Sequence, residues 1–213
     1  LTTFDLLNAQ LSNVHLNLRE LWNNATKEYN MFELFHLDPL QVLKVLLLIR
    51  QTKNEDENPT CTQKDLNNLH KIYKIFDFYL DYQSDKNECV EFRQQFKEDW
   101  KEACRYTSKA LEIIQRDFGA CQKKYIPYTP MIVTLAAIEH WRKDYDQRFQ
   151  GRMKEKIKQW YWGAIFRQAY EAGTDNVINH HYKSLMEWLK PGERRNVPSE
   201  IRFKMCKKDI EKA

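Results

Sequence analysis

Residues that interrupt helices are scarce in this sequence. It has 5 glycines and 6 prolines in 213 residues, about half or less of their usual share. Long apolar runs are missing too, since the longest, at 42–49 and 131–138, fall far below the roughly 20 residues of a membrane span. The start of the chain lacks the basic and then apolar pattern of a signal peptide. We therefore expect a soluble, cytoplasmic protein with no membrane association, built from long helices and short joints.

Metal-binding and disulfide patterns are missing as well. The five cysteines are Cys61, Cys89, Cys104, Cys121 and Cys206, and no two of them form a CxxC pair. A zinc site needs closely spaced ligands, and a disulfide framework needs cysteines that pair. We expect reduced thiols and no bound metal.

The sequence contains no glycine-rich phosphate loop, GxSxG elbow, HExxH motif or paired-carboxylate motif. His180 and His181 are adjacent, so on a helix they point about 100° apart and cannot bind one ion together. His140 and Asp144 lie four residues apart and fit either an oriented base or, more commonly, a surface ion pair. His70 flanks an apolar stripe and is most simply a packed histidine. We expect no catalytic residue and no cofactor in this chain.

The signals of amphipathic helices, in contrast, are abundant. Asn17 can cap a helix, and Asp38 followed by Pro39 is a typical helix start. Thr62 begins a helix with apolar residues at intervals of three and four, namely Leu66, Leu69, Tyr73, Phe76 and Leu80. The polar stretch 51–61 is predicted to be the loop before it.

The longest helical pattern covers residues 85–118. One stripe of it is apolar and consists of Phe92, Phe96, Trp100, Cys104, Leu111, Ile114 and Phe118. Gly119 stands where a C-terminal cap is expected. The pattern predicts one continuous helix.

Residues 125–130 (YIPYTP) predict a rigid, extended lead-in to the next helix. That helix is predicted to begin near Met131, to stay apolar through Ile138, and then to continue as an amphipathic helix. Trp141, Tyr145 and Phe149 would share one stripe of this continuation, because they are spaced four residues apart.

Three further helices are predicted in the remaining chain, at 153–171, at 175–189 and beyond the break at Pro191 and Gly192. Together the patterns predict an all-α fold, a multi-helix bundle of about seven to nine helices. We expect residues 1–189 to form one helical domain and residues 190–213 to form a basic C-terminal helix or a linker to another domain. The start at Leu1 suits a portion of a longer protein, although a processed chain would look the same.

Charge is uneven along the chain, whose formal net charge is +4. Residues 51–103 hold 12 acidic and 8 basic side chains, whereas residues 142–167 hold 8 basic and 3 acidic ones. The C-terminal half is therefore basic, which favours an acidic partner.

This basic stretch makes contact with nucleic acid plausible. Its cations are Arg142, Lys143, Arg148, Arg152, Lys154, Lys156 and Lys158. The aromatic residues among and beside them are Tyr145, Phe149, Trp160, Tyr161 and Trp162. Cations neutralise phosphates, and aromatic rings stack on bases. In the alternative interpretation the rings belong to the core and the cations form an ordinary solvated face.

The helix around residue 160 is apolar on two sides. One face holds Ile157, Trp160, Tyr161, Ala164 and Ile165, and the opposite face holds Trp162 and Phe166. Such a helix is predicted to lie between two neighbours. Gly163 would allow a ligand or another helix to come close beside Arg167 and Tyr170, and the pattern is compatible with both.

Several stretches resemble, in order and approximate spacing, the region that follows the N-terminal domain of GmrSD-type proteins. They are FDLLNA at 4–9, LRELW at 18–22, the helix start at Asp38, YIPYTPM at 125–131 and KQWYWGAIFRQAY at 158–170. YIPYTPM is similar to the family's "PY" helix start and contains Tyr125, Pro127, Tyr128 and Pro130. KQWYWGAIFRQAY is similar to the family's RW-(F/Y)-W-x-x-(V/I)-F-x-x-x-Y pattern and contains Trp160, Tyr161, Trp162, Gly163, Arg167 and Tyr170. The resemblance covers residues 4–189.

GmrSD-type proteins belong to modification-dependent restriction and phage-defence systems. The resemblance implies an N-terminal ParB/sulfiredoxin-like domain, with a DGQQR-type motif, that binds or hydrolyses a nucleotide. A helical region follows it, often with an HNH nuclease domain in the same chain or a partner chain. Neither motif occurs in these 213 residues. The chain would then be a fragment, the helical region alone, and the NTPase or nuclease chemistry would lie outside it.

The favoured function is a non-catalytic helical module that supports the upstream nucleotide-binding domain and contacts DNA. The alternative is a protein–protein interaction module whose basic half docks an acidic partner. A stand-alone enzyme is the least favoured hypothesis, because no catalytic constellation is present.

Overall fold

The computed structural model describes residues 2–73, 86–171, 174–192, 197–198 and 202, which contain helices and no strand. The α-helices are α1 (Thr3–Ser12), α2 (Leu18–Glu28), α3 (Asn30–Leu34), α4 (Pro39–Lys53), α5 (Gln63–Asn67), α6 (Leu69–Ile72), α7 (Lys86–Phe118), α8 (Met131–Trp141), α9 (Gln147–Phe166) and α10 (Thr174–Leu189). Two 3₁₀ turns are η1 (Lys123–Tyr125) and η2 (Arg142–Asp144). The predicted all-α multi-helix bundle is confirmed. None of the described helices combines the length and apolarity needed to cross a bilayer.

Three helices begin where their polar caps predict. Asn17 accepts a hydrogen bond from the Glu20 amide at the start of α2, and Asp38 accepts one from the Leu40 amide at the start of α4. Thr62 and Asp65 form a reciprocal capping box at α5. Each side chain satisfies an amide that the first helical turn leaves unpaired.

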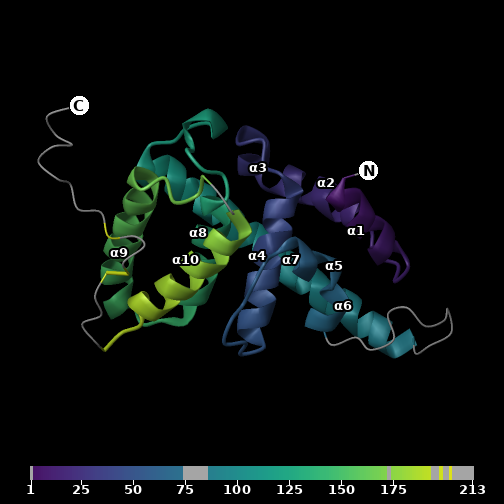
Figure 1. Cartoon of the computed structure of the whole chain (residues 1–213). Helices are drawn as coiled ribbons and strands as arrows, with labels where there is room; N and C mark the ends of the chain where they lie inside the picture. Colours follow the sequence, from purple (N-terminus) through teal and green to yellow (C-terminus); the bar gives the residue numbers. More distant parts are fainter. Residues whose placement is uncertain (1, 74–85, 172–173, 193–196, 199–201, 203–213) are drawn as a thin grey trace, which may run out of the picture.

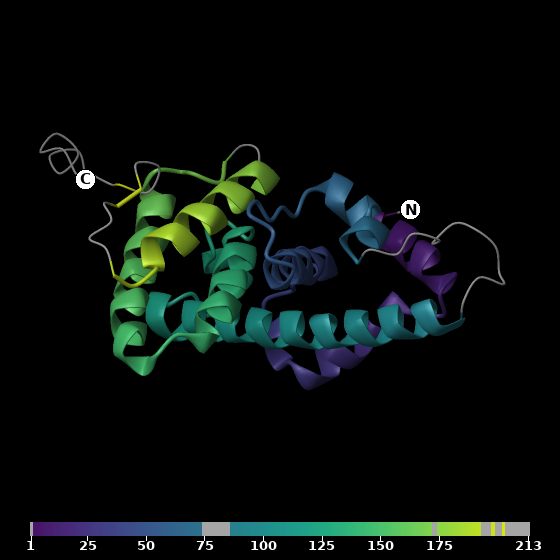
Figure 2. The same cartoon turned by 90° about the horizontal axis from the view of Figure 1, so that it is seen from below.

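The longest helix, α7, has 33 residues and extends about 50 Å at 1.5 Å per residue. It runs along the length of the molecule, with α4 and α8 against its buried side (Figure 2). Every residue of α8 from Met131 to His140 is buried. Gly119, with φ of +78°, follows α7 in the left-handed conformation that a helix-ending glycine adopts.

The two ends of the molecule are built from different parts of the sequence. Helices α1, α2, α5 and α6 lie toward one end of α7, whereas α8, α9 and α10 gather toward the other (Figure 1). Helix α9 lies at the outer edge of the molecule in this view. No other described helix covers its outward face.

The prediction of one helix starting at Thr62 is wrong in its extent. The helix is interrupted at Asn68, which separates α5 from α6. Phe76 and Leu80 of the predicted stripe lie outside the described residues. The preceding loop is shorter than predicted, since α4 continues through Lys53. Gln51 is buried there and donates hydrogen bonds to the carbonyls of Leu47 and Thr60.

The prediction of one long helix from Met131 through Phe149 is also wrong. Helix α8 ends at Trp141, the turn η2 follows, and Asp146 caps a new helix by accepting from the Arg148 amide. Trp141 and Tyr145 meet across this turn with ring centroids 4.7 Å apart. The spacing of Trp141, Tyr145 and Phe149 could not reveal the turn, because these apolar residues keep the four-residue interval of a helix on both sides of it.

The remaining boundaries differ in detail from the predictions. Helix α9 begins earlier than predicted and ends at Phe166, because Gln168 takes the left-handed conformation (φ +55°). The lead-in to α8 is not wholly extended, since Tyr125 belongs to η1. The break after Leu189 is present, with Gly192 at φ +113°. The predicted last helix falls largely outside the described residues.

Candidate functional site

A cleft of about 390 Å³ lies between the C-terminal turns of α7, the end of α8 with η2, and α9. Its basic lining residues are Lys109, Arg116, Arg142, Lys143, Lys154 and Lys158. Its acidic lining residues are Glu112, Asp117 and Glu139. The six cations outnumber the three carboxylates, so the cleft attracts anions. We call it the basic cleft.

The deepest charges of the basic cleft are paired with one another. Glu139 is only 1% exposed, and both of its oxygens accept hydrogen bonds from the Arg142 guanidinium at 2.6 Å. Lys109 approaches the same carboxylate at 3.1 Å from α7. A third guanidinium nitrogen of Arg142 donates to Gln150. Because this cluster joins α7, α8, η2 and α9, it fixes the shape of the cleft.

The outer charges of the basic cleft are more exposed. Arg116 pairs with its neighbour Asp117 at 2.7 Å, and Lys158 pairs with Glu155 at 3.1 Å. The hydrogen bond from Arg116 lowers the pKa of Asp117, and the charges of Lys158 and Lys154 act in the same direction. Lys154 and Lys158 therefore lie close enough to the α7 wall to influence it electrostatically.

A stripe of four residues follows this rim along α9. Lys154, Lys158, Trp162 and Phe166 are spaced by four residues, so they form a ridge on one side of the helix. Trp162 is 43% exposed and Phe166 is 59% exposed. Trp162 also meets the ring of Phe118, a wall residue of the basic cleft, at a centroid distance of 6.1 Å. The ridge thus runs from cations into aromatic rings.

The prediction that α9 lies between two neighbours is therefore wrong. Ile157, Trp160, Tyr161 and Ala164 are buried, as expected for the inner face. The opposite rings, Trp162 and Phe166, lie at the surface instead, because α9 is at the edge of the molecule (Figure 1).

The seven cations singled out from the sequence have different environments. Arg142, Lys143, Lys154 and Lys158 line the basic cleft, although Arg142 is only 4% exposed and faces Glu139 rather than solvent. Its guanidinium is therefore a structural part of the cleft floor.

The other three cations lie outside the cleft. Arg148 and Arg152 are exposed on the first turns of α9, where Arg148 pairs with Asp146. The Lys156 ammonium donates to the carbonyl of Trp188 at 2.5 Å. This bond satisfies a carbonyl at the C-terminus of α10, where helix carbonyls lack partners.

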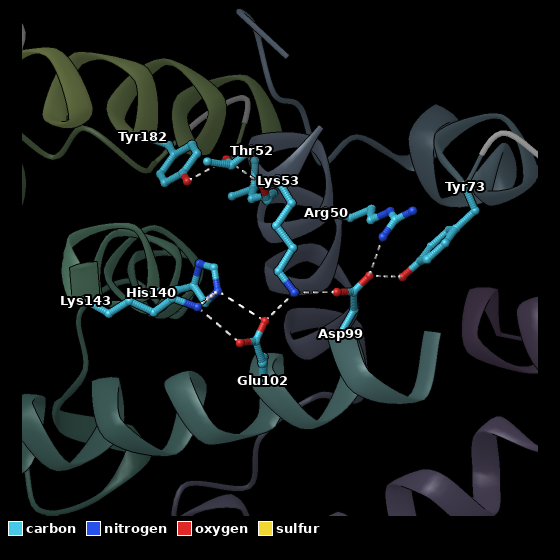
Figure 3. Close-up of polar contacts among 10 residues, drawn as sticks. Arg50, Thr52, Lys53, Tyr73, Asp99, Glu102, His140, Lys143 and Tyr182 are labelled. Carbon is cyan, nitrogen blue, oxygen red and sulfur yellow. Dashed lines mark hydrogen bonds and ion pairs between the residues drawn. The ribbon is translucent and has the colours of Figure 1, made fainter. Parts of the chain in front are cut away.

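A network of charged residues lies next to the basic cleft and connects α4, α7 and η2, with Asp99 buried and Glu102 partly exposed (Figure 3). At its centre, Glu102 lies 2.5 Å from the Lys53 ammonium and 3.1 Å from the Lys143 ammonium. Burial would raise the pKa of Glu102, but the hydrogen bonds from these lysines outweigh it and lower the pKa to about 2. Glu102 is thus ionised at neutral pH and weakly basic.

Asp99 forms the inner part of the same network (Figure 3). Its carboxylate is only 3% exposed and lies 2.8 Å from the Lys53 ammonium and 3.7 Å from the Arg50 guanidinium. The buried Tyr73 hydroxyl donates to it at 2.9 Å. Arg50 and Lys53 come from the last turn of α4, and Tyr73 comes from the end of α6. The network therefore acts as a cross-link between helices.

His140 belongs to this network and does not pair with Asp144. It is 4% exposed, and its Nε2 lies 3.2 Å from Glu102 and 2.9 Å from the Lys143 ammonium. Burial and then the charge of Lys143 lower its pKa, so the imidazole is neutral at pH 7. Among the described residues, Nδ1 has no hydrogen-bond partner. The i, i+4 prediction failed because α8 ends before Asp144.

The adjacent histidines on α10 lie in different surroundings. His181 is buried, and its Nδ1 accepts a hydrogen bond from the Trp160 indole at 3.1 Å. The ring of Tyr170 meets it edge-on at 5.0 Å. His180 lies at the surface. The described part of the chain contains no group of three or more potential metal ligands, and within it Cys61, Cys104 and Cys121 are free; Cys206 and the side chains of Cys89 and His70 lie outside it.

The residues of the stretch KQWYWGAIFRQAY (158–170) separate into core and surface. Trp160, Tyr161 and Gly163 are buried, and Tyr170 is buried with its hydroxyl 3.0 Å from that of Thr134. Arg167 is at the surface and donates to the carbonyl of Arg202. Gly163, Arg167 and Tyr170 therefore do not form a common exposed strip.

The residues of the earlier stretch, YIPYTPM, are only partly packed against the core. Tyr128 is half-buried and its ring stacks on Tyr170 at 6.2 Å. Pro130 is the residue before α8, Pro127 is exposed, and Tyr125 is 57% exposed.

Sequence reasoning missed Lys109 and Arg116 as parts of the site. Nothing in the amphipathic pattern of α7 indicates that its last turns face α9. The regular spacing of Lys154, Lys158, Trp162 and Phe166 was a readable signal for the other wall.

Comparisons of the chain with protein-family models, with curated proteins and with solved structures find no match.

Proposed function

We propose that this chain is a non-catalytic helical module that binds the phosphate backbone of DNA in the basic cleft. The observation that supports this most strongly is the excess of six cations over three carboxylates around one opening. Lys154 and Lys158 stand at its rim, where a phosphate can reach them. Binding would release counterions from the DNA, which makes the affinity strongly dependent on salt.

The experiment is a titration of a fluorescent DNA duplex with the 213-residue chain at several salt concentrations. The variant K154E/K158E reverses two rim charges, and K97E/K101E is the matched control on the exposed side of the first half of α7. We expect affinity to fall steeply with salt and to fall more than tenfold in the cleft variant, with a much smaller loss in the control. Absent or salt-insensitive binding would overturn the proposal.

A second candidate function is docking of an acidic protein partner on the same surface. It is favoured by the exposed rings of Trp162 and Phe166 beside the cations, because protein interfaces are enriched in aromatic residues and arginine. Absent or salt-insensitive DNA binding would favour this alternative.

We also propose, from the sequence resemblance alone, that the parent protein is a GmrSD-type restriction and phage-defence protein in the cytoplasm. The module would then support an upstream nucleotide-binding domain and act with a nuclease domain or subunit. Determining the coding sequence upstream of the Leu1 codon tests this proposal. A DGQQR-type motif there is expected, and a coding region without one would contradict it.

In this proposal the chain needs no cofactor and performs no chemistry of its own. Glu102 and His140 support this, because the carboxylate is held by two lysines and the imidazole is buried beside one of them. Nucleotide hydrolysis or DNA cleavage by the purified 213-residue chain would contradict the non-catalytic assignment.

A further inference from the structure

The ridge of Lys154, Lys158, Trp162 and Phe166 places cations and rings in line along α9. Four residues of a helix rise about 6 Å, so each step along the ridge presents a new group to a ligand that lies along the helix. Lys158 is one turn from Trp162, and both border the basic cleft, the first directly and the second through Phe118. A ligand with alternating anionic and planar groups would match this order.

The Trp162 ring is exposed and yet held in a fixed orientation. Phe118 and Tyr161 stack on one another at 3.8 Å, and Trp162 stands nearly perpendicular to both, at interplanar angles of 89° and 88°. Phe166 lies at 6.1 Å on a more parallel plane. A ring with its orientation fixed beforehand loses little conformational freedom when a planar ligand stacks on it.

The exposed aromatic ring discriminates between two forms of nucleic acid. In a duplex the bases are stacked inside the helix, so a surface tryptophan cannot reach their faces, whereas the bases of a single strand are accessible. The cations alone would serve either form, because both carry phosphates. The aromatic half of the ridge would be unused by a duplex.

We infer that the basic cleft and the ridge beside it bind single-stranded nucleic acid, with a base stacked on Trp162 and the adjoining phosphates at Lys154 and Lys158. This inference rests on the proposed function and adds that the nucleic acid is single-stranded. Lys109 and Arg116 form the opposite wall of the cleft. The strand would follow α9 from the cleft toward Phe166.

The test compares a fluorescent oligothymidylate with a duplex of equal length, using the 213-residue chain. The variants are W162A, which removes the ring, and W162F, which keeps an aromatic face. Y125A is the matched control, because Tyr125 is similarly exposed (57%) and lies outside the ridge. Thermal unfolding of each variant establishes that the fold is kept.

We expect W162A to weaken single-strand binding roughly 5- to 150-fold, which is the effect of losing one stacked base converted at about 1.4 kcal/mol per tenfold. Duplex binding should change less than about twofold, W162F should retain most of the single-strand affinity, and Y125A should match the native chain. Equal losses for both ligands, or no loss for either, would overturn this inference. If K154E/K158E still weakened DNA binding, the proposed function would stand, whereas salt-insensitive binding to both ligands would overturn both.

Discussion

Two clusters of charge lie along α7, and they differ in how their charges are matched. Around Asp99 and Glu102 each carboxylate has at least two cationic partners, and Asp99 is only 3% exposed. In the basic cleft, cations outnumber carboxylates six to three and the rim reaches solvent. Lys143 belongs to both clusters. The same residue types cross-link helices where every carboxylate is held by cations from other helices, and they offer a binding surface where cations reach solvent at the rim of a cleft.

The largest effect should follow from removing Asp99. In D99A the buried Tyr73 hydroxyl loses its acceptor and Arg50 loses a buried carboxylate, while Lys53 keeps Glu102, so the free energy of unfolding should fall by about 3 kcal/mol. Urea denaturation followed by circular dichroism measures this loss. The control E98A changes an exposed neighbour and should stay within about 0.5 kcal/mol. A similar small loss in D99A would show that the buried cluster is not a cross-link.

A smaller effect should distinguish the floor of the cleft from its rim. E139Q removes the charge that Arg142 and Lys109 share, and it should destabilise the fold by about 2–3 kcal/mol, as for a lost hydrogen bond to a charged group. E112Q, at an exposed position of the cleft, should change stability by less than about 0.5 kcal/mol.

Both variants raise the net charge of the cleft equally, so both should bind DNA more tightly at low salt. Equal stabilities of E139Q and E112Q would contradict the distinction between floor and rim. Unchanged DNA affinity in both would contradict the role of the cleft.

Acidification should weaken the buried cluster in two steps. Since the pKa of His140 is lowered from 6.5, the unfolded chain takes up this proton first, and stability should fall as the pH drops below about 6.5. Since the pKa of Glu102 is lowered from 4.5 to about 2, its contribution is complete above pH 4.5 and is lost as the pH falls toward 2. The midpoint of urea unfolding from pH 8 to pH 2 measures both steps. H140Q should flatten the upper step and E102Q the lower one; curves parallel to that of the native chain would contradict the assignment.

The smallest effect on stability is expected at the exposed rim. Arg116 has a side chain that is 67% exposed and pairs only with its neighbour Asp117 among the described contacts. R116A should therefore change the free energy of unfolding by less than about 0.5 kcal/mol. Because Arg116 lines the cleft, the slope of log affinity for DNA against log salt should decrease by about one. A large loss of stability without a change of slope would place Arg116 in the structural cluster instead.

Local patterns in the sequence predicted much of the helical framework. Asn17, Asp38 and Thr62 cap the helices that they were expected to start, and Gly119 directly follows the end of α7, as predicted. Caps and amphipathic periodicity depend on residues within one or two turns, so they are legible in a single sequence. The turn after Trp141 was missed because the apolar spacing of Trp141, Tyr145 and Phe149 continues across it. Asp146, which caps α9, is the only local signal of a new helix start in this stretch.

The candidate site was predicted only in part. The basic stretch on α9 was evident, and Lys154 and Lys158 do line a cleft. Arg142 was expected at a surface and instead faces buried Glu139, while the other wall comes from Lys109 and Arg116 on α7. Glu139, Lys109 and Arg116 lie far from α9 in the sequence or on another helix, and hydrophobic periodicity gives no information about contacts between helices.

The helices, their caps and the concentration of positive charge in the C-terminal half can be recognised without the fold, because each follows from composition or from neighbouring residues. The pairing of charges, as for Asp99 with Lys53, and the exposure of rings, as for Trp162, become visible only when the helices are packed together. Burial and pairing depend on which helices meet. Helix α9 lies at the edge of the molecule (Figure 1), so the apolar face with Trp162 and Phe166 is at the surface. A helix that is apolar on two sides is usually buried, and here the second side is a candidate binding surface.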